Sequence, residues 1–434
     1  MRLKIKDFGK IQEAEIDWNG LTVIAGKNDT GKSTIGKLFF VIVKTFASYS
    51  EVYKTWYGIR LCRRLIDALS GLLRGTNRIA LKENVEQFKL LESIYENLVQ
   101  NFKPGFLSKK GSIYNYPQLH ESSKTLLQQL LSQGLDASVK GNLELLLHDL
   151  SKDLSAEEMF DGAFRLMMND CFRRNYNNSL HGSDTGEIDY ILEDTSNLHI
   201  KIKDNKIEIT SLDVSKKNPF YEDITYIDFP GIIDERFQHL YLSNLDWTDD
   251  LLDKTSRIKT GGDAILDDLN DIIGNLQDAL GAASFFVDKD SNEFKYKVSD
   301  TASPLNIINI ASGSKAFGLI YMLIKHGIIT KNTPLILDEP ENHLHPEWQV
   351  IYAKFLVHLV LNGFNVLLTS HSPAFIQTLI QATVANEIWN TKRVNFYLAE
   401  LSSNANYSYI RNVNKSVNDI FESLSKPIEA LWRE

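Results

Sequence analysis

A glycine-rich segment near the start of the chain restricts the fold more than any other feature. Residues 26–33 read GKNDTGKS and fit the pattern G-x-x-x-x-G-K-[ST]. A short apolar run rich in β-branched residues, 21–25, precedes the segment, and helical spacing follows it over residues 33–46. A glycine-rich turn between a strand and a helix lets backbone amides surround phosphate oxygens at the positive end of the helix dipole. The pattern therefore predicts a phosphate-binding loop in an α/β fold.

The side chains of this loop suit nucleotide chemistry. In such a loop Lys32 reaches the β- and γ-phosphates, and the Ser33 hydroxyl ligates Mg²⁺. The other loop residues offer amides or short polar side chains to the phosphates. We therefore expect nucleotide contacts from Gly26, Lys27, Asn28, Asp29, Thr30, Gly31, Lys32, Ser33 and Thr34.

Two carboxylates follow a second predicted strand. Residues 335–337 form a short apolar run, and Asp338 and Glu339 come directly after it. Ligands of parallel sheets bind at the carboxyl ends of the strands. Asp338 suits a partner of the Mg²⁺ site, and Glu339 suits the base that orients and polarises an attacking water. In a chain without the glycine-rich loop, a charge pair at a helix start would be the simpler interpretation.

A histidine follows a third predicted strand. Residues 366–369 form the strand, His371 comes after it, and Pro373 begins a helix. A histidine at this position can hydrogen-bond the γ-phosphate or a backbone carbonyl across a dimer. Taken alone, the histidine would be a satisfied polar residue or a helix cap. In this order of motifs we expect His371 to take part in catalysis.

A serine and a glycine begin another predicted helix. Ser312 and Gly313 follow a predicted strand over residues 306–310. Helix amides at such a start can bind an anion. The same residues also make a good N-cap without any ligand.

Turn residues separate the predicted strands in the middle of the chain. Asp204–Asn205 and the single Asn197 are typical of hairpin turns, and residues 285–298 are expected to form a further hairpin. Residues 48–181 have helical spacing with glycine and proline breaks, and no heptad pattern persists long enough for a coiled-coil arm.

The composition restricts the class of protein. A net charge of −9 over 434 residues argues against a protein that coats nucleic acid, although a local basic patch remains possible. The two cysteines, Cys62 and Cys171, exclude a disulfide framework and a cysteine-based zinc site. Polar residues interrupt the longest apolar stretch, and the first residues have no apolar signal region. We therefore expect a cytoplasmic protein without a membrane partner.

Together, these motifs resemble the ATP-binding-cassette ATPase head, in the soluble branch that contains SMC and RecF proteins. Asn28 matches the asparagine of that branch's phosphate loop, and residues 341–346 occupy the position of the D-loop. Ser312 and Gly313 match the signature motif, whose usual second glycine and glutamine are here Ser314 and Lys315. The resemblance covers about residues 1–45 and 300–400.

This resemblance implies an ATPase that uses ATP and Mg²⁺, with a P-loop head made from both ends of the chain. The family's heads close on each other as a dimer or higher homo-oligomer, and Ser312 and Gly313 then act on ATP bound to the opposite subunit. The expected segments are a first part of the head (1–47), a mostly helical insertion (48–185), a β-rich segment returning to the head (186–234), a helical segment (235–283) and the second part of the head (284–434).

A narrower resemblance concerns anti-phage defence. The segments GKNDTGKST, IASGSKAFG, LDEPENHLHPEWQ and LLTSHSPAF look like the ATPases of the Septu and retron-associated PtuA type, the AriA type of PARIS systems and the OLD-family ATPase domain. That group implies a scaffold that regulates a separate nuclease subunit of the HNH or Toprim type. The stretch after His371 is too short for the Toprim nuclease of OLD proteins. We therefore expect no nuclease activity from this chain.

Other functions stay open. A RecF-like DNA repair ATPase would use the same head. Arg174 and His181 have the R-x₆-H spacing of HEPN ribonucleases, although about one such pair is expected by chance. Residues 54–82 hold seven cations and one acid, and they form either a nucleic-acid site or a solvated helix face.

Overall fold

The computed structural model describes residues 1–74, 154–177, 185–193, 195–214, 221–233, 246–260, 284–288, 290–291, 293–298, 302–342 and 344–431, with isolated positions between 124 and 148. The chain divides into two compact units. The first, which we call the head, contains Met1–Ala47 and Phe164–Glu434, and the second contains Ser48–Ala163. Both ends of the chain therefore belong to one unit.

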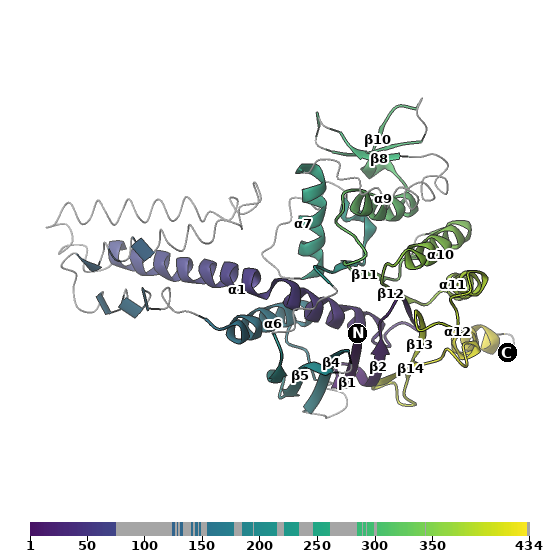
Figure 1. Ribbon diagram of the computed structural model, residues 1–434, viewed down its shortest axis with the longest axis horizontal. Helices are drawn as coiled ribbons and strands as arrows, with labels where there is room; N and C mark the ends of the chain where they lie inside the picture. The colour runs from purple at the N-terminus through teal and green to yellow at the C-terminus, as the bar shows by residue number, and fades with distance from the viewer. Residues whose placement is uncertain are drawn as a thin grey trace. The chain divides into compact units, whose positions relative to one another are not determined.

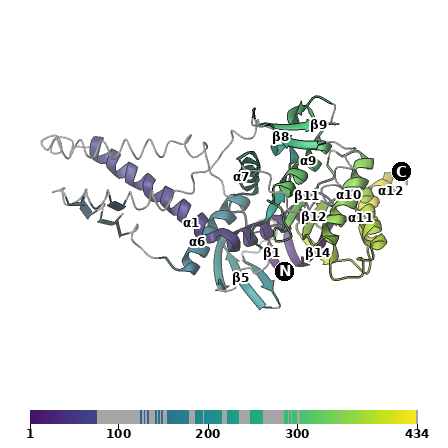
Figure 2. The ribbon, with the colours of Figure 1, turned by 45° about the horizontal axis from the view of Figure 1, so that its top comes forward.

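An 11-stranded sheet forms the centre of the head, in the order β6-β5-β4-β1-β2-β14-β13-β3-β12-β11-β7. Strands from the two ends of the chain lie side by side, as the purple and yellow ribbons show (Figure 1; Figure 2). The prediction of an α/β head built from both chain ends is confirmed. The strands are β1 (Arg2–Phe8), β2 (Ile11–Asp17), β3 (Leu21–Gly26), β4 (Thr185–Leu192), β5 (Thr195–Lys203), β6 (Lys206–Leu212), β7 (Thr225–Ile227), β11 (Leu335–Asp338), β12 (Val366–Ser370), β13 (Val394–Leu401) and β14 (Ser408–Asn412).

The strands β13, β3, β12, β11 and β7 run parallel to one another. Parallel strands are covered on both faces, which explains why β3 and β12 are buried along their whole length. The register pairs Asp338 with Thr369 and Ser370 with Ala25. The three segments that follow these strands therefore begin at the same edge of the sheet.

The strands β6, β5, β4, β1 and β2 pair antiparallel and alternate between buried and solvated residues. Asp204 and Asn205 have φ values of +50° and +56°, which a two-residue hairpin turn requires, so that predicted turn is confirmed. The turn predicted at Asn197 is wrong. Asn197 lies inside β5, buried, and its Oδ1 accepts a hydrogen bond from the Leu192 amide at 3.0 Å. Its polar side chain satisfies a backbone group of the neighbouring strand instead of bending the chain.

The helices are α1 (Lys32–Arg74), α6 (Ala156–Phe172), α7 (Trp247–Thr260), α9 (Ser312–Lys325), α10 (Pro346–Leu361), α11 (Pro373–Ala385) and α12 (Asn418–Leu431). Helix α1 leaves helical geometry at Ser48 (φ −140°, ψ 17°), where the head ends and the second unit begins. None of the described helices is long and apolar enough to cross a membrane.

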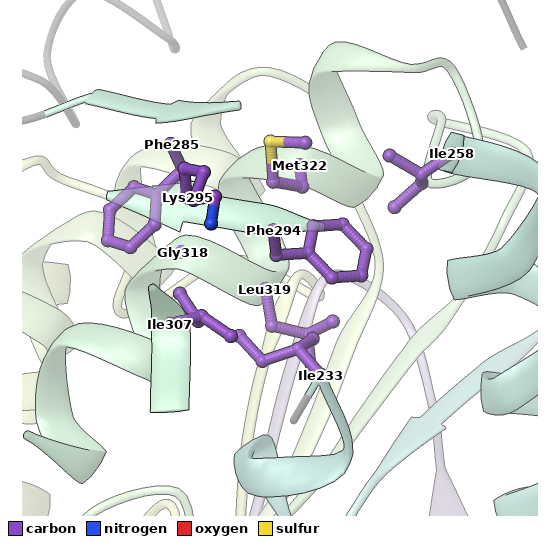
Figure 3. A pocket seen from close by; sticks show the side chains of 9 residues that line it. All are labelled: Ile233, Ile258, Phe285, Phe294, Lys295, Ile307, Gly318, Leu319 and Met322. Carbon is purple, nitrogen blue, oxygen red and sulfur yellow. The ribbon is translucent and has the colours of Figure 1, made fainter. Parts of the chain in front are cut away.

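A second, three-stranded sheet packs on α9. It contains β8 (Ser284–Val287), β9 (Phe294–Lys297) and β10 (Leu305–Asn306), and its first two strands are the predicted hairpin. Figure 3 shows the pocket that β8 and β9 form with α9 and α7, in which the Phe294 ring lies between Leu319 and Met322. A Cβ atom at Gly318 would lie 2.3 Å from the Phe285 ring, so this contact needs a glycine. The pocket is packed apolar core.

The strand predicted over residues 306–310 is wrong beyond Asn306. A 3-10 helix, η5 (Ile307–Asn309), replaces it, because the Asn306 side chain accepts a hydrogen bond from the Ile308 amide at 2.9 Å. Asparagine side chains compete with strand pairing in this way and favour a turn.

A group of four charges, of which Lys254 is buried and the other three are half-buried, joins α7 to α1 and to the residues before β7. Lys44 Nζ lies 2.6 Å from both Asp223 Oδ1 and Asp250 Oδ1. Lys254 Nζ lies 2.7 Å from Asp250 Oδ2 and 3.2 Å from Asp223 Oδ2, and it also donates to Thr225 Oγ1 at 3.0 Å. We call Lys44, Asp223, Asp250 and Lys254 the ionic square. Each lysine faces both carboxylates, so the charges are matched.

Candidate functional site

The glycine-rich loop connects β3 to α1 in a conformation that its sequence allows. Gly31 has a φ of +81°, and a Cβ atom there would lie 2.9 Å from the Ile11 side chain. Asp29 has a φ of +63° and forms an ion pair with Lys10 from the turn between β1 and β2. The Thr30 hydroxyl donates to the Lys27 carbonyl at 2.8 Å, so this side chain closes the loop instead of facing outward.

The rest of the loop is open to solvent. Lys27, Asn28 and Asp29 are exposed, whereas Gly31, Ser33 and Thr34 are half-buried. Gly26 ends β3 beside β13. The loop therefore offers its backbone and its exposed side chains at the carboxyl edge of the parallel strands, where ligands of α/β sheets bind.

Lys32 is buried at the base of the loop. Its side chain is 4% exposed, and its Nζ donates to the Lys27 carbonyl at 2.7 Å. The same Nζ lies 3.6 Å from Glu339 Oε1. Burial lowers the pKa of Lys32, although Glu339 and Asp338 act in the opposite direction. The fold thus leaves this cation incompletely compensated.

Asp338 accepts hydrogen bonds from three hydroxyl groups. Ser33 Oγ donates to its Oδ1 at 2.9 Å, and Tyr226 OH donates to its Oδ2 at 2.8 Å. Thr369 Oγ1 donates to Oδ1 as well. The structure therefore brings together Ser33 and Asp338, the two residues predicted for Mg²⁺, and adds Thr369 and Tyr226, which the sequence analysis missed.

Glu339 has a left-handed backbone conformation, and its carboxylate has polar contacts on both oxygens. Its φ is +50°, and such a conformation costs a non-glycine residue about 1 kcal/mol. Asn342 Nδ2 donates to Oε2 at 3.0 Å, and His371 Nδ1 lies 3.3 Å from Oε1. Burial raises the pKa of Glu339, but the Asn342 hydrogen bond and the charges of His371 and Lys32 outweigh it, so the pKa lies below the ordinary value. The carboxylate is therefore held in the charged form that a base requires.

Glu341 holds the segment that carries His371. Its side chain is 3% exposed, and Oε1 accepts hydrogen bonds from Ser370 Oγ (2.6 Å) and from the amides of His371 (3.1 Å) and Ser372 (3.3 Å). Burial raises the pKa of Glu341, against the effect of these hydrogen bonds. We call Lys32, Glu339, Glu341 and His371 the rim cluster.

Ser312 and Gly313 begin α9 apart from this cluster. The N-cap is Ala311, which provides no side-chain hydrogen bond, and Ser312 is exposed as the first helical residue. The N-cap interpretation of Ser312 is therefore wrong. A Cβ atom at Gly313 would lie 2.8 Å from Leu344 Cδ2. Among the described residues, no hydrogen bond or ion pair joins Ser312 or Gly313 to the phosphate loop.

Three predictions fall partly or wholly outside the described residues. Of the basic segment, residues 75–82 lie outside them, and α1 contains the rest. Of the ribonuclease pair, His181 lies outside, and Arg174 follows the end of α6 with a φ of +62°. Most of the helical segment at 235–283 lies outside as well, apart from α7.

The chain was compared with known proteins. A search of curated proteins found no match. Similar solved structures include the SMC head domain from Thermotoga maritima (11% identity, TM-score 0.40, 95% of this chain and 98% of that chain). Others are Smc head domains from Pyrococcus furiosus (11%, 0.34, 97% and 98%) and Pyrococcus yayanosii (11%, 0.37, 98% and 99%). Residues 1–376, which include the phosphate loop, both carboxylates and His371, match the AAA ATPase domain family. The chain belongs to this family of ATPases.

Proposed function

We propose that the head binds MgATP and hydrolyses it at a site completed by a second copy of the chain, and that this cycle regulates a separate nuclease in anti-phage defence. The ATPase part of this proposal rests on contacts at one edge of the sheet. Ser33 donates to Asp338, and Glu339 lies beside both Lys32 and His371.

The residues present fit ATP and Mg²⁺. The loop offers free backbone around an incompletely compensated lysine, which suits a phosphate. The described residues contain no group of three or more metal-ligating side chains. One hydroxyl and one carboxylate, Ser33 and Asp338, suit Mg²⁺, which takes few protein ligands and completes its octahedron with water and phosphate. When bound, Mg²⁺ neutralises charge on the phosphates.

Three residues of the rim cluster have separate roles in the proposed hydrolysis. Lys32 neutralises phosphate charge, and binding ATP replaces its bond to the Lys27 carbonyl. Glu339 accepts a proton from the attacking water, since its carboxylate is charged and a quarter exposed. His371 lies against Glu339 and orients it or the γ-phosphate. Phosphoryl transfer needs mostly such placement and charge.

The start of α9 is the part of the second copy that we expect to contact the bound ATP. Ser312 and Gly313 are at an exposed helix start whose amides lack a side-chain cap and an acidic neighbour. Such a start favours a phosphate. Because no described contact connects it to the loop of its own chain, we infer that it faces the ATP of a second head. ATP would then hold two heads together, and hydrolysis would release them.

Glu339→Gln tests the ATPase and the composite site together. The amide keeps the shape but cannot accept a proton, so hydrolysis should fall by about a thousandfold while ATP binding persists. Light scattering should then show an ATP-dependent dimer or larger assembly, which Ser312→Arg should abolish without preventing nucleotide binding. Association of Ser312→Arg at the wild-type level would disprove the composite site.

The defence role rests on the sequence resemblance, so it needs its own test. The purified chain should not cleave DNA or RNA. It should co-purify with an HNH or Toprim protein encoded by a neighbouring gene, and it should change that protein's nuclease activity when ATP is added. A RecF-like repair ATPase would instead bind DNA with an affinity that falls steeply with salt. Cleavage by the chain alone, lost in His181→Ala, would favour the ribonuclease alternative.

A further inference from the structure

Glu341 has a bonding pattern that the proposed mechanism does not use. One carboxylate oxygen, Oε1, accepts three hydrogen bonds from consecutive residues at the end of β12, namely Ser370, His371 and Ser372. The other oxygen, Oε2, is buried and has no hydrogen-bond partner among the described residues. A carboxylate with an unmatched buried oxygen is costly, and a neutral acceptor would satisfy the same amides at a lower cost. Its presence therefore calls for a role beyond holding backbone.

The surroundings of His371 indicate this role. Its Nδ1 lies 3.3 Å from Glu339 Oε1 and 3.9 Å from Glu341 Oε1, and it has no well-aligned hydrogen bond within the described residues. The imidazole therefore faces two carboxylates, of which Glu339 is a quarter exposed and Glu341 is buried. The backbone of His371 is tied to the same Glu341 oxygen. One side chain thus fixes the histidine by its amide and attracts its ring.

Hydrogen bonds within residues 339–344 also link Glu341 to Glu339. The Asn342 side chain donates to Glu339 Oε2, and the Asn342 amide donates to the Glu339 carbonyl at 3.0 Å. The Leu344 amide donates to the Glu341 carbonyl at 3.1 Å, and Leu344 packs on Gly313. A shift of this segment would move Glu339, His371 and the start of α9 together.

We propose that Glu341 is a positioning residue for hydrolysis, which holds the His371 imidazole against Glu339; this inference rests on the proposed ATPase function. Glu341 touches neither the nucleotide loop nor Ser33 through any hydrogen bond or ion pair of the described residues. We therefore expect its effect on the catalytic step more than on ATP binding, because its charge acts on Lys32 less than the charges of Glu339 and Asp338 do. The carboxylate acts by charge as well as by shape, because its negative charge faces the ring nitrogen.

Two variants separate charge from shape. Glu341→Gln keeps an acceptor for the three donors but removes the charge that faces His371. Ser370→Ala keeps the charge and removes one donor. Glu347→Gln is the matched control, because Glu347 lies in the first turn of α10 with its side chain 85% exposed. Thermal unfolding of each variant verifies that it is folded.

The kinetic result expected for Glu341→Gln is a kcat lowered about tenfold or more, because a small displacement of a catalytic group can cost about a hundredfold. KM and the ATP affinity from calorimetry should stay within about twofold. Ser370→Ala should show a smaller loss of kcat, and Glu347→Gln none. A wild-type kcat in Glu341→Gln would overturn the proposal, as would an equal loss of ATP affinity and kcat.

A measurement without nucleotide tests the inference separately from the ATPase function. In protein with ¹³C-labelled histidine, the ring signal of His371 is assigned by its absence in His371→Gln. It should shift in Glu341→Gln and stay in place in Glu347→Gln. An unshifted signal would show that Glu341 does not position the ring. If the wild-type chain hydrolyses no ATP, the proposed function fails even where the ring signal shifts.

Discussion

The ionic square and the rim cluster are two groups of lysines and carboxylates in one unit, and the fold compensates their charges to different degrees. In the square, the surrounding aspartates overcome burial and raise the pKa of Lys44, and two lysines hold the pKa of Asp223 at about 2 against burial. In the rim cluster, burial lowers the pKa of Lys32 and raises that of Glu341, whereas the Asn342 hydrogen bond and nearby charges keep the pKa of Glu339 below its ordinary value. In the square, each lysine lies within ion-pair distance of both aspartates. In the rim cluster, burial outweighs the charges that oppose it at Lys32, and one Glu341 oxygen has no hydrogen-bond partner among the described residues. This contrast separates charges that stabilise the fold from charges that we propose bind nucleotide.

The largest expected effect is on the square. Lys254→Met should lower the free energy of unfolding by about 4 kcal/mol, because removing one partner leaves two half-buried aspartates with a single lysine. Chemical denaturation measures this loss. Arg257→Met on the same helix is the control, since its side chain is half-exposed and pairs with Asp253 at the surface. A loss below about 1 kcal/mol for Lys254→Met would remove the distinction between the two groups.

The corresponding change in the rim cluster should affect binding and not stability. Lys32→Ala should lower ATP affinity by about a hundredfold or more, because bonds from a charged donor to phosphate are worth about 3 kcal/mol. The unfolding free energy should change little, because the fold disfavours the charged form of Lys32. Calorimetric titration with ATP measures the affinity. Lys27→Ala, which removes the exposed cation of the same loop, should keep most of it. Equal affinities for the two variants would contradict the site.

One carboxylate of each group, Asp223 and Glu341, should respond to pH with opposite signs. The pKa of Asp223 is depressed from 3.8 to about 2, so its contribution is present above pH 3.8 and is lost as the pH falls toward 2. The shift corresponds to about 2 kcal/mol. Asp223→Asn should therefore be less stable than wild type at neutral pH, and the gap should close in acid.

The pKa of Glu341 is raised, so its stabilising contribution is present below the ordinary value of 4.5 and is lost as the pH rises. Glu341→Gln should therefore be at least as stable as wild type at neutral pH, and the two should converge in acid. Unfolding curves between about pH 2 and pH 7 measure both gaps. Gaps of the same sign would show that the two carboxylates are buried for the same reason.

The smallest effect expected is at Tyr226, which donates to the metal-site carboxylate. Tyr226→Phe should cost about 1 kcal/mol of stability, the typical value of one hydrogen bond. It should also raise the Mg²⁺ concentration needed for half-maximal hydrolysis, because Asp338 loses one of its three hydroxyl donors. A magnesium titration of the ATPase rate measures this. Tyr221→Phe is the control, because among the described residues no hydrogen bond joins the Tyr221 hydroxyl to Asp338.

The sequence predicted the residues that a short motif contains. Lys32 and Ser33 follow from the loop pattern, and Asp338, Glu339 and His371 follow from the strands that precede them. The residues it missed reach the site through pairing between distant strands. Tyr226 is placed by the parallel register of β7 with β11, in which it pairs with Ile336. No local pattern encodes that register.

Glu341 was part of a recognised segment, but its role depends on amides that lie about thirty residues further along the chain. The errors have a related cause. Asn197 was predicted to form a turn and Asn306 to begin a strand, and in each case the backbone depended on which amide the side chain could reach. Asn197 found one on the neighbouring strand, and Asn306 found one two residues ahead.

The short strand β7 connects the two groups of charges. Thr225 Oγ1 accepts a hydrogen bond from Lys254, and the next residue, Tyr226, donates one to Asp338. Successive residues of a strand point to opposite faces, so a slip of one position would exchange them and break both contacts. Correct alignment of this edge strand during folding is therefore also what gives Asp338, the carboxylate proposed for Mg²⁺, its Tyr226 donor. A chain that misaligned β7 would retain its phosphate loop but would lose both the Lys254 contact and one hydroxyl donor to Asp338.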